Sequence, residues 1–265
     1  MKNDAWRRDP LFYGDLHAIA PRHTDLDPWR HVNNVAISCL HAEARMQWML
    51  RTLGADAWYG DGVLLRPASV TTDFLGEGHY PEPLRMGARC VGYDGHGWEL
   101  ASALFQAGAC IGVQHTRMAA WCDERPVPLP PEVLQALAAG AAPRHAPREA
   151  LGAATIHALE DYPVTVEVAS RYADADVDGC ASEIAVARYM EQARVAAMAG
   201  AMRAARSDTR MQQLGMVVAH SRIHLLRQRR PTAVWRVGVG LVRIGNSSLT
   251  VRTGLFRHDA CHAVA

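Results

Sequence analysis

The chain has 265 residues, of which 49% are hydrophobic, so it can form ordinary globular cores and is not expected to be disordered. Its 28 basic and 27 acidic side chains leave a net charge of +1, which does not favour nucleic acid as a partner. The 6 cysteines include no CxxC pair, which argues against a zinc ribbon or a disulfide framework and fits a reducing compartment.

The N-terminal stretch MKNDAWRRDPLFYGD is polar and lacks the apolar core of a signal peptide. No segment approaches the ~18 consecutive apolar residues of a membrane span. We therefore expect a cytoplasmic protein with no membrane partner.

The first predicted elements are a strand over residues 15–24 and a helix over residues 35–53. Between them lie the polar turn DLDPWR and two asparagines. The side chain of Asn33 or Asn34 caps the helix, because it accepts hydrogen bonds from free N–H groups of the first turn, and Gly54 ends it. Apolar residues at helical spacing predict one stripe: Val35, Cys39, Ala42, Met46 and Met49.

Four strand-like segments follow, with the pair Asp94-Gly95 as a tight-turn signal between two of them. They cover residues 63–74, 84–93, 98–106 and 110–121. The composition then becomes rich in proline and alanine. Over residues 125–158 we predict a proline-rich exit, a short helix at residues 132–139 and a linker between two domains.

The second half of the chain repeats this order. Residues 164–169 alternate as a strand does, and a helix is predicted over residues 182–205. Further strands are predicted at residues 216–226, 234–244 and 249–257. In the middle one, the apolar residues Trp235, Val237, Val239 and Leu241 alternate with Arg236, Gly238 and Gly240, which is typical of a sheet with one buried face.

The repeat is also visible residue by residue. RHTDLDPWRHVNNVAISCLHAEAR begins at Arg22, and RYADADVDGCASEIAVARYMEQAR begins 149 positions later, at Arg171. We therefore predict an α+β fold of two tandem units, over residues 12–124 and 159–265, joined by the linker at residues 125–158. In each unit a long helix is wrapped by an antiparallel sheet, and the units pair into a pseudo-dimer with a continuous sheet.

The order of strand, DxD turn, HVNN, helix ending in E-A-R and four strands resembles the hot-dog fold thioesterases of the 4-hydroxybenzoyl-CoA and acyl-CoA type. DLDPWRHVNN is also similar to the DLD–HVNN motif of the acyl-ACP thioesterases, which are tandem double hot dogs. The resemblance covers nearly the whole chain apart from the linker and the N-terminal segment. It implies hydrolysis of acyl thioesters of CoA or of acyl carrier protein, with no metal and no cofactor.

By motif match, the catalytic aspartate is Asp27 and the histidine of HVNN is His31. The backbone N–H of Asn34, at the helix start, would polarise the thioester carbonyl. Asn33 and Trp29 are the candidate substrate-binding residues. The acyl-ACP enzymes carry an asparagine where this chain has Trp29, so the roles of that asparagine do not transfer, which counts against acyl-ACP specificity.

Two chemical routes remain open for Asp27, since a carboxylate can attack the thioester or act as general base on water. Capping and turn formation are the structural alternative for both Asp25 and Asp27. We keep that alternative for Asp25. His31 is interpreted as a proton partner or as a residue that orients the carboxylate.

The second copy keeps Asp176 as a candidate second site but differs around it. The same offset replaces the histidine and both asparagines of HVNN by Cys180, Ser182 and Glu183. A glutamate at a helix start suits the helix dipole, but its charge would repel a developing oxyanion. We therefore expect the second site to be degenerate, with Cys180 as a packing residue.

Three other groups of residues are assigned no chemistry. Gly76-Glu77-Gly78 is too short for a phosphate loop, and His258, Cys261 and His262 lack metal-site spacing. One basic run is interpreted as a solvated loop, with the phosphates of CoA as an alternative ligand. It consists of Arg222, Arg227, Arg229 and Arg230.

The sequence thus predicts a thioesterase that converts acyl-CoA, or a related acyl thioester, to free acid and thiol. We expect homo-oligomers of the pseudo-dimer. The alternatives are a non-catalytic acyl-thioester-binding or scaffolding protein, and a hot-dog dehydratase, for which the chain has no matching motif.

Overall fold

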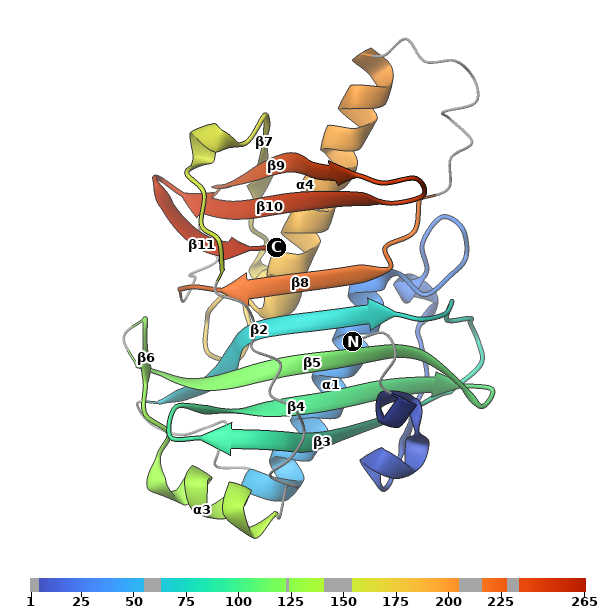
Figure 1. The fold of residues 1–265 in the computed structure, drawn as a ribbon, viewed down its shortest axis with the longest axis vertical. Helices are drawn as coiled ribbons and strands as arrows, with labels where there is room; N and C mark the ends of the chain where they lie inside the picture. The colour runs from blue at the N-terminus through green and yellow to red at the C-terminus, as the bar shows by residue number, and fades with distance from the viewer. Residues whose placement is uncertain (1–4, 55–62, 123, 141–153, 205–215, 228–233) are drawn as a thin grey trace. The chain divides into compact units, whose positions relative to one another are not determined.

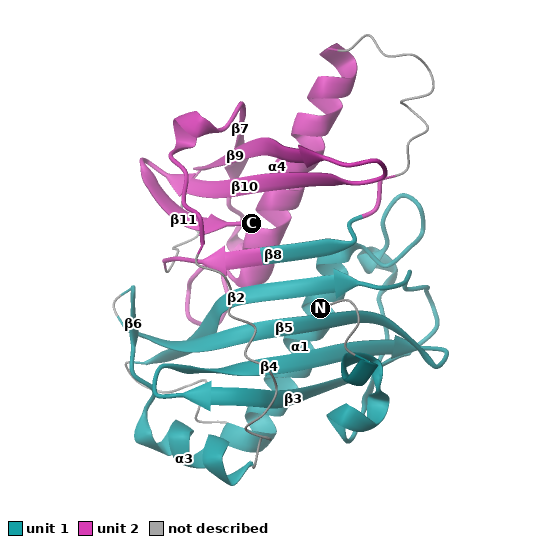
Figure 2. Cartoon of the chain, in the orientation of Figure 1, with its two compact units in different colours: residues 1–151, 218–222 teal, residues 152–217, 223–265 magenta. Residues whose placement is uncertain are grey.

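A computed structural model describes most of the chain and divides it into two compact units (Figures 1 and 2). The described residues are 5–54, 63–122, 124–140, 154–204, 216–227 and 234–265. The first unit comprises residues 1–151 with 218–222, and the second comprises residues 152–217 with 223–265. Each unit contains one long helix and a set of antiparallel strands, so the predicted α+β class is confirmed.

Helix α1 (Asn34–Leu53) is the long helix of the first unit. It begins after Asn33, whose side chain caps it, and ends at Gly54, whose φ of 80° is unfavourable for other residues. Both predicted ends are therefore confirmed. No helix among the described residues is long and apolar enough to cross a membrane.

The sheet of the first unit has the strand order β1-β3-β4-β5-β2, with β6 paired to β5 and the first residues of β8 (His220–Leu225) following β2 (Figure 1). The strands are β1 (His17–Ile19), β2 (Leu64–Phe74), β3 (Leu84–Asp94), β4 (Gly97–Gln106), β5 (Ala109–Cys122) and β6 (Arg125–Val127). The four long strands match the predicted segments. The strand predicted over residues 15–24 is wrong in length, because the chain leaves β3 after Ile19 and turns into a 3-10 helix, η3 (His23–Asp25).

The buried face of α1 differs from the predicted stripe. Of that stripe only Val35 and Met49 are buried, whereas His41 and Arg45 are buried as well. Nδ1 of His41 lies 2.8 Å from the Ser102 hydroxyl, and Arg45 reaches Gln114 on β5 at 3.4 Å. Polar partners on the sheet make this burial tolerable, and a count of apolar residues cannot detect them.

The second unit contains helix α4 (Glu183–Ala204) and strands in the order β8-β11-β10-β9-β7. The strands are β7 (Val164–Ala169), β8 (His220–Leu225), β9 (Val234–Ile244), β10 (Leu249–Arg257) and β11 (Ala260–Val264). Trp235, Val237 and Val239 are buried in one core with the inner face of α4, so the predicted buried face is confirmed for these residues. It is wrong for Leu241, which is 52% exposed. The predicted short helix forms as α3 (Pro131–Ala139) and packs in the core of the first unit. The rest of the predicted linker lies largely outside the described residues.

The repeat extends to the segment before each sheet. In the first unit Tyr13 packs on Gly87, where an added Cβ would stand 2.6 Å from the Cβ of Tyr13. In the second unit Tyr162, 149 positions later, packs on Gly238 in the same way, at 2.4 Å from its ring. Both segments therefore lie closer to a strand than any residue other than glycine would allow.

Candidate functional site

The DLDPWRHVNN turn of the first unit is held by its own backbone. The N–H of Asp27 donates to the His31 carbonyl at 2.8 Å, and the N–H of Arg30 donates to the Asp27 carbonyl at 3.0 Å. Arg30 takes the left-handed conformation, with φ of 70°, to close the loop. An antiparallel bridge between Leu26 and Val32 joins the two ends. The turn is thus a defined structure rather than an open connection.

The Asp27 carboxylate is part of this turn. Its Oδ1 accepts hydrogen bonds from the backbone N–H groups of Trp29, at 2.9 Å, and His31, at 3.0 Å. Oδ1 accepts both hydrogen bonds, so the direction in which the other carboxylate oxygen, Oδ2, points is fixed. Because Asp27 is neither fully buried nor fully exposed, the carboxylate is orientated and accessible at once.

Asp25 has a different environment from Asp27. It is buried, and its carboxylate accepts from the Arg22 backbone N–H and from the Arg22 guanidinium, both at 2.8 Å. Its carbonyl accepts from the Asn33 N–H at 2.8 Å. Asp25 therefore ties the turn to the residue that caps the helix.

The cap at the start of α1 uses Asn33. Its side-chain oxygen accepts from the N–H of Val35 at 2.7 Å and, more weakly, from that of Ala36 at 3.4 Å. The Asn34 N–H is not among the groups bound by the cap. This N–H and the positive end of the α1 dipole lie a few residues after Asp27 in the chain.

Two residues beside this turn had no predicted role: Glu77, in the Gly76-Glu77-Gly78 stretch that was assigned no chemistry, and His79. A carboxylate oxygen of Glu77 is 3.4 Å from Nε2 of His31. His79 forms an antiparallel bridge with His31, and the two imidazole rings are 5.7 Å apart, edge to face. No local signal could have found them, since they belong to the loop after β2 and reach His31 only through tertiary pairing.

This loop is held from two sides. The Val32 N–H donates to the Gly78 carbonyl at 2.8 Å. From the other side, the buried Gln106 amide accepts from the His79 N–H and donates to the His79 and Glu82 carbonyls, at 2.8 to 2.9 Å. Glu77 is therefore placed against His31 by a fixed backbone, although its own side chain is half exposed.

The second unit repeats the turn but not its surroundings. Oδ1 of Asp176 accepts from the N–H groups of Asp178 and Cys180, both at 3.1 Å, and Gly179 has φ of 69° where the first unit has Arg30. Ser182 caps α4 through the Ala185 N–H at 3.0 Å. The residue equivalent to His31 is Cys180, which is buried. The second unit therefore has no histidine at this position.

Asp174, the counterpart of Asp25, is also buried and structural. It accepts from the Arg171 N–H and from the Tyr189 hydroxyl, both at 2.8 Å. Burial disfavours its charge, but the hydrogen bonds from Arg171 and Tyr189 outweigh burial and lower the pKa of the Asp174 carboxyl. The first aspartate of the motif thus anchors the turn in both units.

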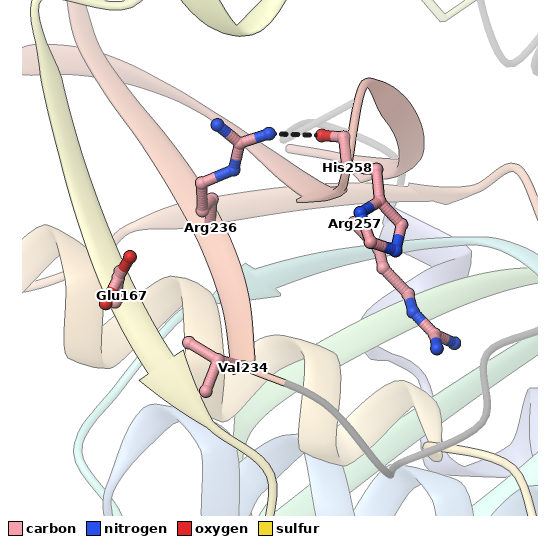
Figure 3. A pocket seen from close by; sticks show the side chains of 5 residues that line it. All are labelled: Glu167, Val234, Arg236, Arg257 and His258. Atoms are coloured by element: carbon pink, nitrogen blue, oxygen red, sulfur yellow. Dashed lines mark hydrogen bonds between the residues drawn. The ribbon is translucent and has the colours of Figure 1, made fainter.

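A pocket of about 370 Å³ lies elsewhere, within the second unit (Figure 3). Its lining residues are Glu167, Val234, Arg236, Arg257 and His258. The Arg236 guanidinium donates to the His258 carbonyl at 2.6 Å, as the dashed line in Figure 3 marks. None of the predicted site residues lines this pocket. Of the basic run, Arg229 and Arg230 lie outside the described residues.

The side chains near Asp27 offer hydrogen bonds, charge and proton transfer. Across the part of the chain that the structure describes, no three or more His, Cys, Asp or Glu side chains cluster in a way that could hold a metal ion. Asp27, His31 and Glu77 are the titratable side chains at this turn that could take part in acid–base or nucleophilic chemistry.

Residues 21–137 match the family model described as the thioesterase-like superfamily. No protein of curated function matches the sequence.

Solved structures similar to this chain cover almost its whole length. It is similar to the 12:0-ACP thioesterase from Umbellularia californica, with a TM-score of 0.75 and 9% identity, covering 99% of this chain and 97% of that one. It is also similar to an acyl-ACP thioesterase from Bacteroides thetaiotaomicron, with a TM-score of 0.69 and 9% identity, covering 94% and 95%. At such identities the likeness shows the fold alone, and it confirms the fold that the sequence predicted.

Proposed function

We propose that this thioesterase-like protein hydrolyses acyl thioesters, with acyl-CoA as the first candidate and acyl carrier protein as the second. The observation that carries the proposal is the fixed carboxylate of Asp27, which lies a few residues before the α1 N-terminus and beside a His31–Glu77 pair. Thioester hydrolysis needs an orientated oxygen nucleophile or base, and donors for the carbonyl oxygen as it becomes negative. This part of the first unit offers both.

In the general-base route, Asp27 takes a proton from water while the resulting hydroxide attacks the carbonyl carbon. In the nucleophilic route, an Asp27 oxygen attacks directly, and water later cleaves the mixed anhydride. In both, the C–S bond breaks and the thiolate takes up a proton, giving acid and thiol. The Asn34 N–H and the α1 dipole would stabilise the oxyanion.

His31 and Glu77 would serve proton transfer. At 3.4 Å from Nε2 of His31, the Glu77 carboxylate would orient the imidazole. A positioned histidine side chain can then act as the proton donor to the leaving thiolate. Asn33 contributes by capping α1, and Trp29 presents its N–H to Asp27 and its ring to solvent.

The test is release of free thiol from acyl-CoAs of several chain lengths, measured for the wild type, Asp27→Asn and Asp176→Asn. Asp27→Asn keeps an oxygen for the N–H groups of Trp29 and His31, so the turn is preserved while the negative charge is lost. We expect at least a 10²-fold loss of kcat in this variant and little change in Asp176→Asn. Equal losses in both variants would contradict a single working site in the first unit.

One observation supports a second candidate, a non-catalytic thioester-binding protein. Asp27 and Asp176 make the same two hydrogen bonds, so turn formation alone accounts for both carboxylates. Calorimetric binding of acyl-CoA without thiol release from any substrate would favour this candidate.

A further inference from the structure

In the part of the chain that the structure describes, the exposed Trp, Tyr and Phe side chains lie at the two DxD turns and in the loop beside the first. Among the Trp, Tyr and Phe residues that the structure describes, three are exposed: Trp29 at 63%, Tyr80 at 45% and Tyr172 at 99%. Trp29 follows Asp27 by two residues, and Tyr80 follows His79. Tyr172 lies in the second unit, in the 3-10 helix that ends at Asp174. Trp29 and Tyr80 lie beside the candidate site of the first unit, whereas Tyr172 lies at the turn whose site is expected to be degenerate. Trp29 and Tyr80 are therefore the aromatic residues placed to contact a ligand of the first site.

Trp29 and Tyr80 are held by their backbones. The Trp29 N–H donates to the Asp27 carboxylate. Tyr80 directly follows His79, whose backbone N–H and carbonyl are both hydrogen-bonded to the Gln106 side-chain amide. The Tyr80 ring also lies edge-on to the His23 ring, with centroids 6.0 Å apart, so it stands at the 3-10 helix that carries Asp25. Rigid aromatic side chains provide contact area at a low cost in conformational entropy.

We infer that Trp29 and Tyr80 form a contact surface for a planar ring of the thioester, an inference that rests on the proposed hydrolysis. The ring has two chemical sources, the adenine of CoA and an aryl acyl group, which share the same flat π face. Stacking tolerates either, because it needs a face rather than a pattern of donors and acceptors.

The proposal is tested with four thioesters: benzoyl-CoA, octanoyl-CoA, benzoyl-pantetheine and octanoyl-pantetheine. We expect Trp29→Ala, and to a smaller extent Tyr80→Ala, to lower kcat/KM about tenfold for the substrates that carry the recognised ring. Trp29→Phe should retain most of the activity, because it keeps a ring. Tyr172→Ala, an exposed aromatic residue at the equivalent turn of the second unit, is the matched control and should change nothing.

The pattern of losses identifies the ring. A loss with both CoA thioesters assigns adenine, and a loss with both benzoyl thioesters assigns the aryl group. An equal loss with octanoyl-pantetheine, which carries no ring, would overturn the proposal, because Trp29 would then act only through Asp27. No loss with any substrate would overturn it as well.

A binding measurement separates this inference from the proposed hydrolysis. The S-benzyl and S-octyl thioethers of CoA and of pantetheine cannot be hydrolysed, and calorimetry gives their Kd for the same variants. In one outcome the wild type turns over no thioester, while Trp29→Ala still selectively raises the Kd of the thioethers that carry the ring. That result would contradict the proposed hydrolysis and support the ring surface. Unchanged Kd values together with normal turnover would remove the ring surface and leave hydrolysis in place.

Discussion

At the scale of residues, the two aspartates of the DxD turn differ by what they bind. Asp25 is buried against Arg22 and holds the backbone of the capping residue Asn33. Asp27 uses a single oxygen for the turn and keeps access to solvent. The same division holds for Asp174 and Asp176 in the second unit. Two aspartates only two positions apart in the chain therefore have different roles. The first anchors the turn, and the second is the candidate for chemistry.

The His31–Glu77 pair gives a prediction at this scale. His31→Gln should lower kcat about 10²-fold, because the proton donor is lost. Glu77→Gln should lower it less, since the imidazole remains but loses its orienting charge. Steady-state kinetics of the double variant should show a loss well below the product of the single losses, because the two side chains act as a unit. Fully multiplicative losses would indicate that Glu77 acts independently of His31.

At the scale of elements, a tyrosine that packs against a glycine of a strand holds the segment before each sheet in place. Tyr13 belongs to the short 3-10 helix η2 (Pro10–Tyr13), and its hydroxyl donates to the Arg7 carbonyl at 2.8 Å. Arg89 of β3 donates to the Phe12 carbonyl at 2.9 Å and stacks on the Phe12 ring. In the second unit Arg252 donates to the Asp161 carbonyl and stacks on Tyr162. Both units thus use an arginine and an aromatic ring to cover the sheet.

Substitution within β3 tests this fastening. In Gly87→Ala the new Cβ would meet the Cβ of Tyr13 and a methyl group of Leu16, both at 2.6 Å, so η2 must move. We expect a loss of about 1–3 kcal/mol in the free energy of unfolding, measured by urea denaturation. Gly92→Ala, on the same strand with nothing within 4 Å of the added Cβ, is the control and should be nearly neutral. Similar losses in both would show that β3 simply disfavours alanine.

At the scale of the whole molecule, buried polar groups set the response to acid. Burial, with Arg45 and Arg7 nearby, lowers the pKa of His41 to about 3. Asp73 pairs with Arg7 at 3.2 Å and with His220 at 2.7 Å. Burial disfavours its charge, but His220 and Arg7 outweigh burial and lower the pKa of this carboxyl as well.

These shifts predict that stability is lost as the pH falls. An unfolded histidine takes up a proton below about pH 6.5, whereas folded His41 does so only near pH 3, so acid favours the unfolded chain across this range. The Asp73 contribution is lost at lower pH, as the pH falls below the ordinary carboxyl pKa of about 4 and through its lowered folded value. The free energy of unfolding should drop by up to about 1.4 kcal/mol per pH unit between pH 6 and 4 because of His41 alone.

The prediction is checked by urea unfolding at several pH values. His41→Asn keeps a polar group for Ser102 but cannot take up a proton, so its stability should vary less with pH between 6 and 4. His96→Asn, in the exposed β3–β4 turn, is the control and should keep the wild-type slope. An unchanged slope in His41→Asn would show that other groups govern acid unfolding.

Much of the fold follows from local patterns in the sequence. The asparagine cap and the glycine end of α1 depend on interactions within a few residues. The DxD turn is equally local, because its hydrogen bonds join residues at most eight positions apart along the chain, from Asp25 to Asn33. The internal repeat also relates the two units position by position, since a single offset aligns their DxD turns and long helices.

The tertiary structure decided what could not be inferred locally. Glu77 and His79 reach His31 because a loop more than forty residues away forms a β-bridge with the turn. His41 and Arg45 are buried because strands distant in sequence supply their polar partners, against the apolar pattern of the helix. The sequence by itself thus determined the turn, its carboxylate and the helix behind it. Only the folded chain determined which side chains stand beside that carboxylate, because those contacts depend on long-range strand pairing.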